Sequence, residues 1–167
     1  DLINRCIPLM MNSDYPKIIN CSSVLGFISL PYRGLYSATK YSIEALTDAL
    51  RRENYDSKIK FVLIQPGPIN TDIKKKSVKH FEKWIDWKKS VHQKTYKNKV
   101  IKRLYDNNYK DSFNGYELQP DEVTKILINV LNSKKPKARY KITIQTKIAQ
   151  IMTKLLPTNT LDWFFKI

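Results

Sequence analysis

Residues 17–26 read KIINCSSVLG, an apolar run rich in β-branched residues that ends in two serines and a glycine. This composition predicts a fully buried parallel strand over residues 17–22. Residues 60–65, KFVLIQ, predict a second buried strand, which Pro66-Gly67-Pro68 ends abruptly. Residues 35–55 between them predict a long helix, with apolar or small residues at positions 38, 41, 45, 46, 49 and 50. A strand, a helix and a strand in this order favour parallel pairing.

The pattern extends on both sides of this unit. Helices are predicted over residues 1–11, 119–131 and 148–156, and a third strand over residues 140–144. An aromatic stretch closes the chain at residues 161–167. The fold class is therefore α/β, a doubly wound parallel sheet with helices on both faces, and residues 1–167 form a single domain without internal repeats. Because the first helix begins without a cap, a lead-in strand or an initiator methionine, we expect that the natural chain is longer.

Composition and charge limit the classes of function. A hydrophobic content of 42% indicates a globular chain, and Cys6 and Cys21 lie in apolar surroundings, so we expect buried thiols in a reducing, cytoplasmic compartment. No apolar run reaches membrane-spanning length, and no spacing of ligands indicates a metal site. His80 and His92 are expected at the surface.

The formal net charge of +15 is concentrated in one segment. Residues 74–103 contain twelve lysines and arginines against Glu82 and Asp86. Such a run predicts a solvated, partly helical insertion, and no nucleic-acid partner is expected. Phosphate or anionic-lipid binding by this segment is the alternative.

Candidate chemistry lies in residues 36–40, YSATK, with Ser23 thirteen residues upstream. Tyr36 and Lys40 are four residues apart and therefore share one face of a helix. A free phenol has a pKa of about 10, and an adjacent ammonium lowers it toward the range where a group can exchange protons at neutral pH. A serine hydroxyl from another element could hold a substrate oxygen beside the phenol. The alternatives are a solvated Tyr–Lys pair and a plain hydroxyl at the end of a strand.

Three motifs together resemble the short-chain dehydrogenase/reductase family. They are IINCSSVLG (18–26), YSATK (36–40) and IQPGPINT (64–71), in the family's order and at its separations. The resemblance covers nearly the whole chain and is strongest over residues 17–73. It implies that the chain is the C-terminal part of a Rossmann-type domain.

The resemblance also implies an oxidoreductase that uses NAD or NADP to interconvert an alcohol and a ketone or aldehyde. Tyr36 would be the general acid/base, Ser23 would hydrogen-bond the substrate oxygen, and Lys40 would lower the pKa of Tyr36 and bind the nicotinamide ribose. The family branches most similar to this chain act on hydrophobic alcohols and ketones, which implies a small lipophilic substrate.

Further cofactor contacts follow from the third motif. Pro66 and Gly67 would shape the turn against the nicotinamide, and the Ile69 backbone and the Thr71 hydroxyl would meet its carboxamide. Thr71 could instead cap the following helix. The glycine-rich phosphate-binding turn and the catalytic asparagine of the family are not found in residues 1–167, so the N-terminal βαβ half of the domain is expected outside this sequence.

Three expectations concern the remainder of the chain. By the resemblance, residues 74–118 would form the substrate lid. The C-terminal stretch, with Trp163, Phe164 and Phe165 among lysines, would pack as a tail or subunit contact, or touch a membrane peripherally. A homo-oligomer is expected through residues 1–11 and 35–55, which pair between subunits in the family. The alternative function is a catalytically silent relative that serves as an interaction or dimerisation module.

Overall fold

The computed structural model describes residues 2–106 and 116–166. The chain divides into two compact units. The first unit joins residues 1–67 to residues 121–166, and the second unit consists of residues 68–120. The predicted loop at residues 107–115, which includes Tyr109, lies outside the described residues.

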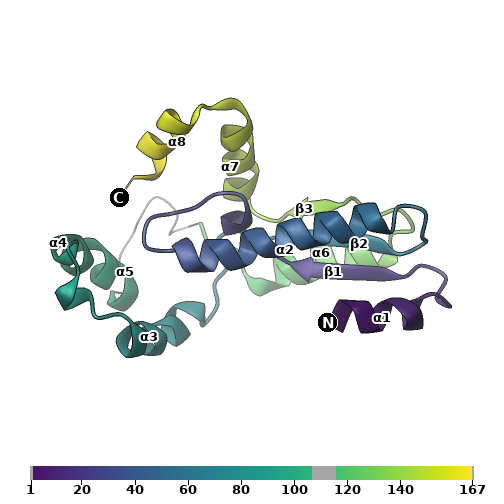
Figure 1. Ribbon diagram of the computed structural model, residues 1–167, viewed down its shortest axis with the longest axis horizontal. Coiled ribbons are helices and arrows are strands. Elements are labelled where there is room, and N and C mark those ends of the chain that lie inside the picture. The colour runs from purple at the N-terminus through teal and green to yellow at the C-terminus, as the bar shows by residue number, and fades with distance from the viewer. Residues whose placement is uncertain (1, 107–115, 167) are drawn as a thin grey trace. The chain divides into compact units, whose positions relative to one another are not determined.

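A three-stranded parallel sheet lies at the centre of the first unit (Figure 1). Its strands are β1 (Lys17–Cys21), β2 (Lys60–Gln65) and β3 (Arg139–Lys141), in the order β1-β2-β3. The parallel α/β arrangement is confirmed. Full burial is confirmed for β2 after its first residue but is wrong for β1, where only Ile18 is buried. The reason is that β1 is an edge strand among the described residues and has a neighbour on one side only.

The third strand is shorter than predicted and begins one residue earlier, because a helix starts immediately after it. Thr143 is the N-cap of α7 (Ile144–Leu155), and its Oγ1 accepts a hydrogen bond from the Thr146 backbone N–H at 3.2 Å. An N-cap threonine fixes the start of a helix, so residues 143 and 144 cannot continue the strand. The last helix, α8 (Thr158–Phe165), occupies the predicted aromatic stretch.

The long helix α2 (Gly34–Glu53) runs in front of the sheet in Figure 1. Leu50 of the predicted apolar stripe packs against the core cluster of Ile18, Ile59 and Phe61, but the buried residues of the helix lie outside that stripe. Its buried residues are Ser37, Glu44 and Thr47, whereas Leu46 of the predicted apolar stripe is 62% exposed. Hydrogen bonds explain the difference. Thr47 Oγ1 accepts from Asn20 Nδ2 of β1 at 2.9 Å, and Glu44 binds Gln65 of β2, so polar contacts join this helix to the strands.

The remaining helices of the first unit complete its core. α1 (Leu2–Met10) packs Ile3, Ile7 and Met10 against a cluster of Ile18, Ile59 and Phe61. α6 (Pro120–Asn132) buries Val130 and is drawn behind the sheet in Figure 1. Cys6 on α1 is half-buried, and Cys21 is exposed at the end of β1, so the expectation of buried thiols is wrong. Both cysteines are free.

The second unit contains helices α3 (Ile73–Trp84), α4 (Gln93–Thr95) and α5 (Ile101–Tyr105), a 3-10 turn η2 (Trp87–Lys89) and a π-helical turn η3 (Tyr96–Val100). The lysine-rich segment is therefore more helical than its charge suggests. Its helices are joined by aromatic side chains: the ring centroids of Phe81 and Tyr96 are 6.2 Å apart, and the Tyr105 hydroxyl donates a hydrogen bond to Glu82 at 2.7 Å. His80 and His92 are exposed, as predicted.

Candidate active site

Ser23 lies immediately beyond the carboxyl end of β1, where the chain turns into the short helix η1 (Val24–Gly26). Its backbone is extended, and its Oγ accepts a hydrogen bond from the Leu25 N–H at 3.2 Å. The residue is 9% exposed. Because this bond uses a lone pair of the oxygen, the hydroxyl hydrogen can be donated to another oxygen.

Tyr36 and Lys40 lie one turn apart near the start of α2. The Lys40 Nζ donates a hydrogen bond to the Cys21 backbone oxygen at 3.0 Å and lies 5.7 Å from the centre of the Tyr36 ring. Cys21 is the last residue of β1 and precedes Ser23 by two positions. Lys40 therefore connects the helix that carries Tyr36 to the strand end that carries Ser23. Tyr36 is 39% exposed, so its side chain is open to solvent.

The turn after β2 is bound to the Ser23 segment by its backbone. The Val24 N–H donates to the Pro66 carbonyl at 2.8 Å. Gly67 follows in close contact with the start of α7, where a Cβ on Gly67 would lie 2.1 Å from Thr143 Oγ1 and 2.7 Å from Thr146 Oγ1. Glycine is thus required at this position by the approach of two threonines. Both threonines are fully buried, and no sequence pattern connects them to the turn.

Replacing Gly67 by alanine is expected to lower the free energy of unfolding by about 1–3 kcal/mol, because the added methyl group overlaps a buried, β-branched side chain that cannot rotate away. Urea denaturation measures the change. Gly34→Ala is the control, since a Cβ there meets nothing within 4 Å. Equal stability of the two variants would show that α7 moves aside without cost.

Ile69 and Thr71, the other two predicted cofactor contacts, belong to the second unit. Ile69 forms an isolated parallel bridge with Leu118, and the Asn70 N–H donates to the Leu118 carbonyl at 2.9 Å. Thr71 is exposed. The alternative role of Thr71 as a helix cap is wrong, because the N-cap position of α3 is Asp72.

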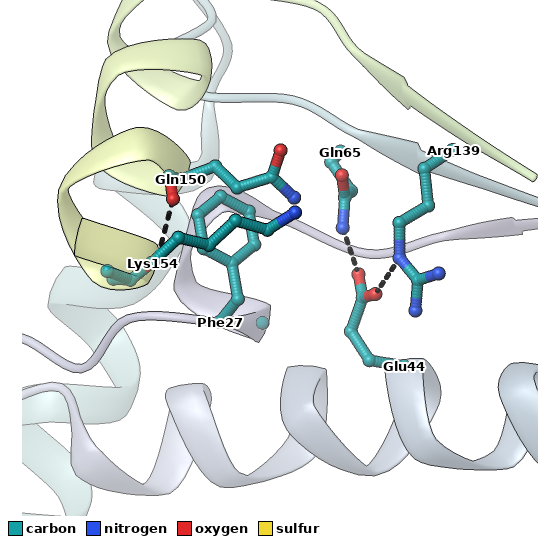
Figure 2. A pocket seen from close by; sticks show the side chains of 8 residues that line it. Phe27, Glu44, Gln65, Arg139, Gln150 and Lys154 are labelled. Atoms are coloured by element: carbon teal, nitrogen blue, oxygen red, sulfur yellow. Dashed lines mark hydrogen bonds and ion pairs between the residues drawn. The ribbon is translucent and has the colours of Figure 1, made fainter.

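A polar network that the sequence did not predict lies beside the turn. Gln65, the last residue of β2, donates from Nε2 to Glu44 Oε1 at 2.9 Å, and Arg139 Nε donates to Glu44 Oε2 at 3.3 Å. These side chains border a pocket of about 400 Å³ (Figure 2), which is lined by Gly26, Phe27, Glu44, Gln65, Arg139, Gln150, Thr153 and Lys154. Arg139 also donates to Asp48 Oδ1 at 2.7 Å. Two features of the sequence could have indicated this network: the carboxylates of Glu44 and Asp48, one turn apart on α2, and Gln65, a polar residue that ends an apolar strand.

The charges of this network perturb each other. Burial works to raise the pKa of Asp48, but hydrogen bonds from Arg139 and Arg51 and their positive charges outweigh it, so the pKa lies below its ordinary value. Burial works to lower the pKa of Arg139, but hydrogen bonds and negative charges from Asp48 and Glu44 outweigh it, so the pKa lies above its ordinary value. The Asp48 carboxylate and the Arg139 guanidinium are therefore charged at neutral pH.

No helix within residues 2–106 and 116–166 is long and apolar enough to cross a bilayer. The same residues contain no group of three or more His, Cys, Asp or Glu side chains arranged to hold a metal ion.

Comparison with known proteins places this arrangement in a family. Residues 1–82 match the family model of the short chain dehydrogenases. All 167 residues align, with 31% identity, to the probable short-chain type dehydrogenase/reductase VdlC of Helicobacter pylori, of which they cover 58%. The chain belongs to the short-chain dehydrogenase/reductase family. Another relative in the family is the 17-beta-hydroxysteroid dehydrogenase type 6 of Rattus norvegicus, 31% identical over 90% of this chain and 48% of its own length.

Solved structures agree with the family fold. A short-chain dehydrogenase from Burkholderia cenocepacia, in complex with NADP, superimposes with a TM-score of 0.63 at 15% identity, covering 98% of this chain and 54% of its own. The similarity confirms the Rossmann-type α/β fold. This short-chain dehydrogenase/reductase chain spans about half the length of the curated relatives it matches.

Proposed function

We propose that the natural protein is an NAD- or NADP-dependent oxidoreductase that interconverts a secondary alcohol and a ketone, or an alcohol and an aldehyde. The observation that carries the proposal is the position of Lys40: its ammonium lies over the Tyr36 ring and is bonded to the strand end next to Ser23. Proton exchange, substrate positioning and a fixed cation are thereby available at one edge of the sheet. Parallel α/β sheets bind ligands at the carboxyl ends of their strands.

Each of the three side chains has one task. In reduction, the Tyr36 phenol gives its proton to the substrate oxygen, and in oxidation the phenolate takes it back. The Ser23 hydroxyl donates a hydrogen bond to the same oxygen and fixes its position. The Lys40 ammonium stabilises the phenolate electrostatically. Because an ammonium has three N–H donors and one is directed to Cys21, Lys40 has further donors for ribose hydroxyls.

The nicotinamide cofactor supplies or accepts the hydride when it is bound. By the proposal, Pro66 and Gly67 would form the turn beside it, and the Ile69 backbone and Thr71 hydroxyl would bind its carboxamide. A solved neighbour in complex with NADP supports a dinucleotide as the ligand. We place the reaction in the cytoplasm, where free cysteines such as Cys6 and Cys21 stay reduced.

The substrate is proposed to be lipophilic. One relative is named for a hydroxysteroid, a hydrophobic secondary alcohol. Residues 74–118 are proposed as the substrate lid. In support, the second unit has a pocket of about 390 Å³ with an aromatic lining that includes Phe81, Trp84, Trp87 and Tyr105.

The proposal is tested by following reduced nicotinamide absorbance with the natural protein and a panel of hydrophobic alcohols and ketones. Turnover with at least one substrate is expected, with a preference for one of the two cofactors. A folded protein that binds the cofactor but turns over no member of the panel would contradict the proposed reaction and favour a catalytically silent relative.

A homo-oligomer is proposed from the outer faces of α1 and α2. Leu2 and Leu9 are 75% and 80% exposed, and Leu35 and Leu46, eleven residues apart on one face of α2, are 85% and 62% exposed. An interface with a second copy of the chain would cover these exposed leucines. The same faces would serve the alternative, a dimerisation module without activity.

Leu46→Glu is expected to convert an oligomer into a monomer, because it places a carboxylate in an apolar contact. Light scattering measures the mass. Leu131→Glu on α6, where leucine is 58% exposed, is the matched control and should leave the mass unchanged. A monomeric unmutated protein, or an oligomer that Leu46→Glu does not disturb, would exclude this contact.

A further inference from the structure

The outward face of α7 carries a continuous apolar stripe. Ile144, Ile148, Ile151 and Leu155 are 70%, 51%, 57% and 76% exposed. Their spacing of four, three and four residues places them in one line along the helix. Thr146 and Ala149 on the opposite face are buried. The helix is thus packed in the first unit by its small residues and presents its large ones to solvent.

Helix α8 continues this apolar surface with aromatic rings. Trp163 and Phe164 are 61% and 53% exposed, and their rings meet edge to face at 5.0 Å. Lys166 lies 5.4 Å from the centre of the Trp163 ring. Phe165 lies on the other side of the helix. It packs against a core cluster of Leu25, Ile28 and Ala149 and so holds the helix in place. Figure 1 shows α8 directly following α7.

Positive charges border the stripe. Lys147 and Lys154 lie on α7, seven residues apart and therefore on one side of it. Burial lowers the pKa of Lys141 on β3, and the charges of Lys154, Arg139 and Lys147 lower it further, which places several cations close together. An anionic surface would relieve this repulsion. A two-fold contact between copies of the chain would instead bring like charges together.

We propose that α7 and α8 form a docking surface for membranes that contain anionic phospholipid. The isoleucine stripe and the Trp163–Phe164 pair enter the headgroup region, where amphipathic helices and tryptophan rings are stable. Lys147 and Lys166 remain at the surface and contact the headgroup anions. The proposal does not depend on the reaction, and it deepens the peripheral membrane contact expected for the C-terminal stretch by naming its residues and its lipid.

Trp163 supplies a direct test in the unmodified docking surface. In a Trp84→Phe/Trp87→Phe background it is the only remaining tryptophan. Vesicles containing phosphatidylserine are expected to shift its emission to the blue, and brominated lipid should quench it. The response should be much weaker with pure phosphatidylcholine and should decrease at high salt. Unchanged emission on the anionic vesicles would overturn the proposal, whatever the enzymatic assay gives.

Paired variants test the stripe. Ile148→Ser/Ile151→Ser is expected to weaken vesicle binding at least about tenfold in cosedimentation, because less apolar surface enters the interface. Ile128→Ser/Leu131→Ser on α6 is the matched control, with two side chains of similar exposure, and should bind as before. Circular dichroism checks folding. Equal losses of vesicle binding in both pairs of variants would contradict the proposal. Self-association in the absence of lipid that only Ile148→Ser/Ile151→Ser abolishes would also contradict it, by assigning the surface to a protein contact.

Discussion

Tyr36→Phe in the natural protein is expected to lower kcat by a factor of about 10² to 10⁴, the usual contribution of a positioned general acid. The substitution removes only the hydroxyl that exchanges the proton. The ring remains beside the Lys40 ammonium, and the Lys40 bond to the Cys21 carbonyl does not involve the phenol. Cofactor affinity is therefore expected to remain nearly unchanged, and the loss appears in turnover.

Tyr41 provides a matched control for this experiment. It lies on the same helix, and its exposure of 42% is close to the 39% of Tyr36. Tyr41→Phe should leave kcat and cofactor affinity as they are. Stopped-flow or steady-state absorbance measures turnover, and fluorescence titration measures cofactor binding. Turnover by Tyr36→Phe comparable to that of the unmutated protein would remove Tyr36 from the mechanism.

Glu44→Ala is expected to cost about 2–3 kcal/mol of folding free energy. The carboxylate accepts hydrogen bonds from Gln65 and from Arg139, and its side chain is 11% exposed. Its removal leaves a fully buried amide donor and a partly buried guanidinium each without one partner, and an uncompensated buried charge or donor costs more than the lost bond itself. Urea denaturation should show a lower midpoint with a similar slope.

Two companions separate the charge from the hydrogen bonds. Glu44→Gln retains an acceptor for Gln65 but weakens the pairing with Arg139, so its loss should be intermediate. Glu53→Ala, at the exposed end of the same helix, should change stability by only a few tenths of a kcal/mol. A Glu44→Ala protein as stable as Glu53→Ala would show that water replaces both partners without cost.

The sequence predicted the elements whose signal is apolar periodicity. The runs at residues 17–22 and 60–65 became β1 and β2, because β-branched and apolar side chains favour strands. The inward face of α2 could not be predicted in this way. Its buried side chains Glu44 and Thr47 form hydrogen bonds to Gln65 and Asn20, and such partners are identified only when the strands are in place.

The reactive side chains of the candidate site could be predicted from the sequence, but the contacts that hold them in place could not. A tyrosine and a lysine four residues apart must share a helix face, so their proximity follows from helix geometry. The anchoring of Lys40 to a carbonyl nineteen positions earlier depends on the packing of α2 over the sheet. Likewise, the need for glycine at position 67 arises from two threonines about eighty residues later in the chain.

The hydrogen bond from Lys40 to the Cys21 carbonyl determines which substitutions this region tolerates. Its acceptor is the main-chain oxygen of residue 21, which every amino acid possesses. The Cys21 side chain, which is exposed, takes no part in that bond. Position 21 can therefore exchange its side chain without loss of the bond, whereas position 40 requires a long cationic chain. Two neighbours in space thus differ sharply in mutational tolerance.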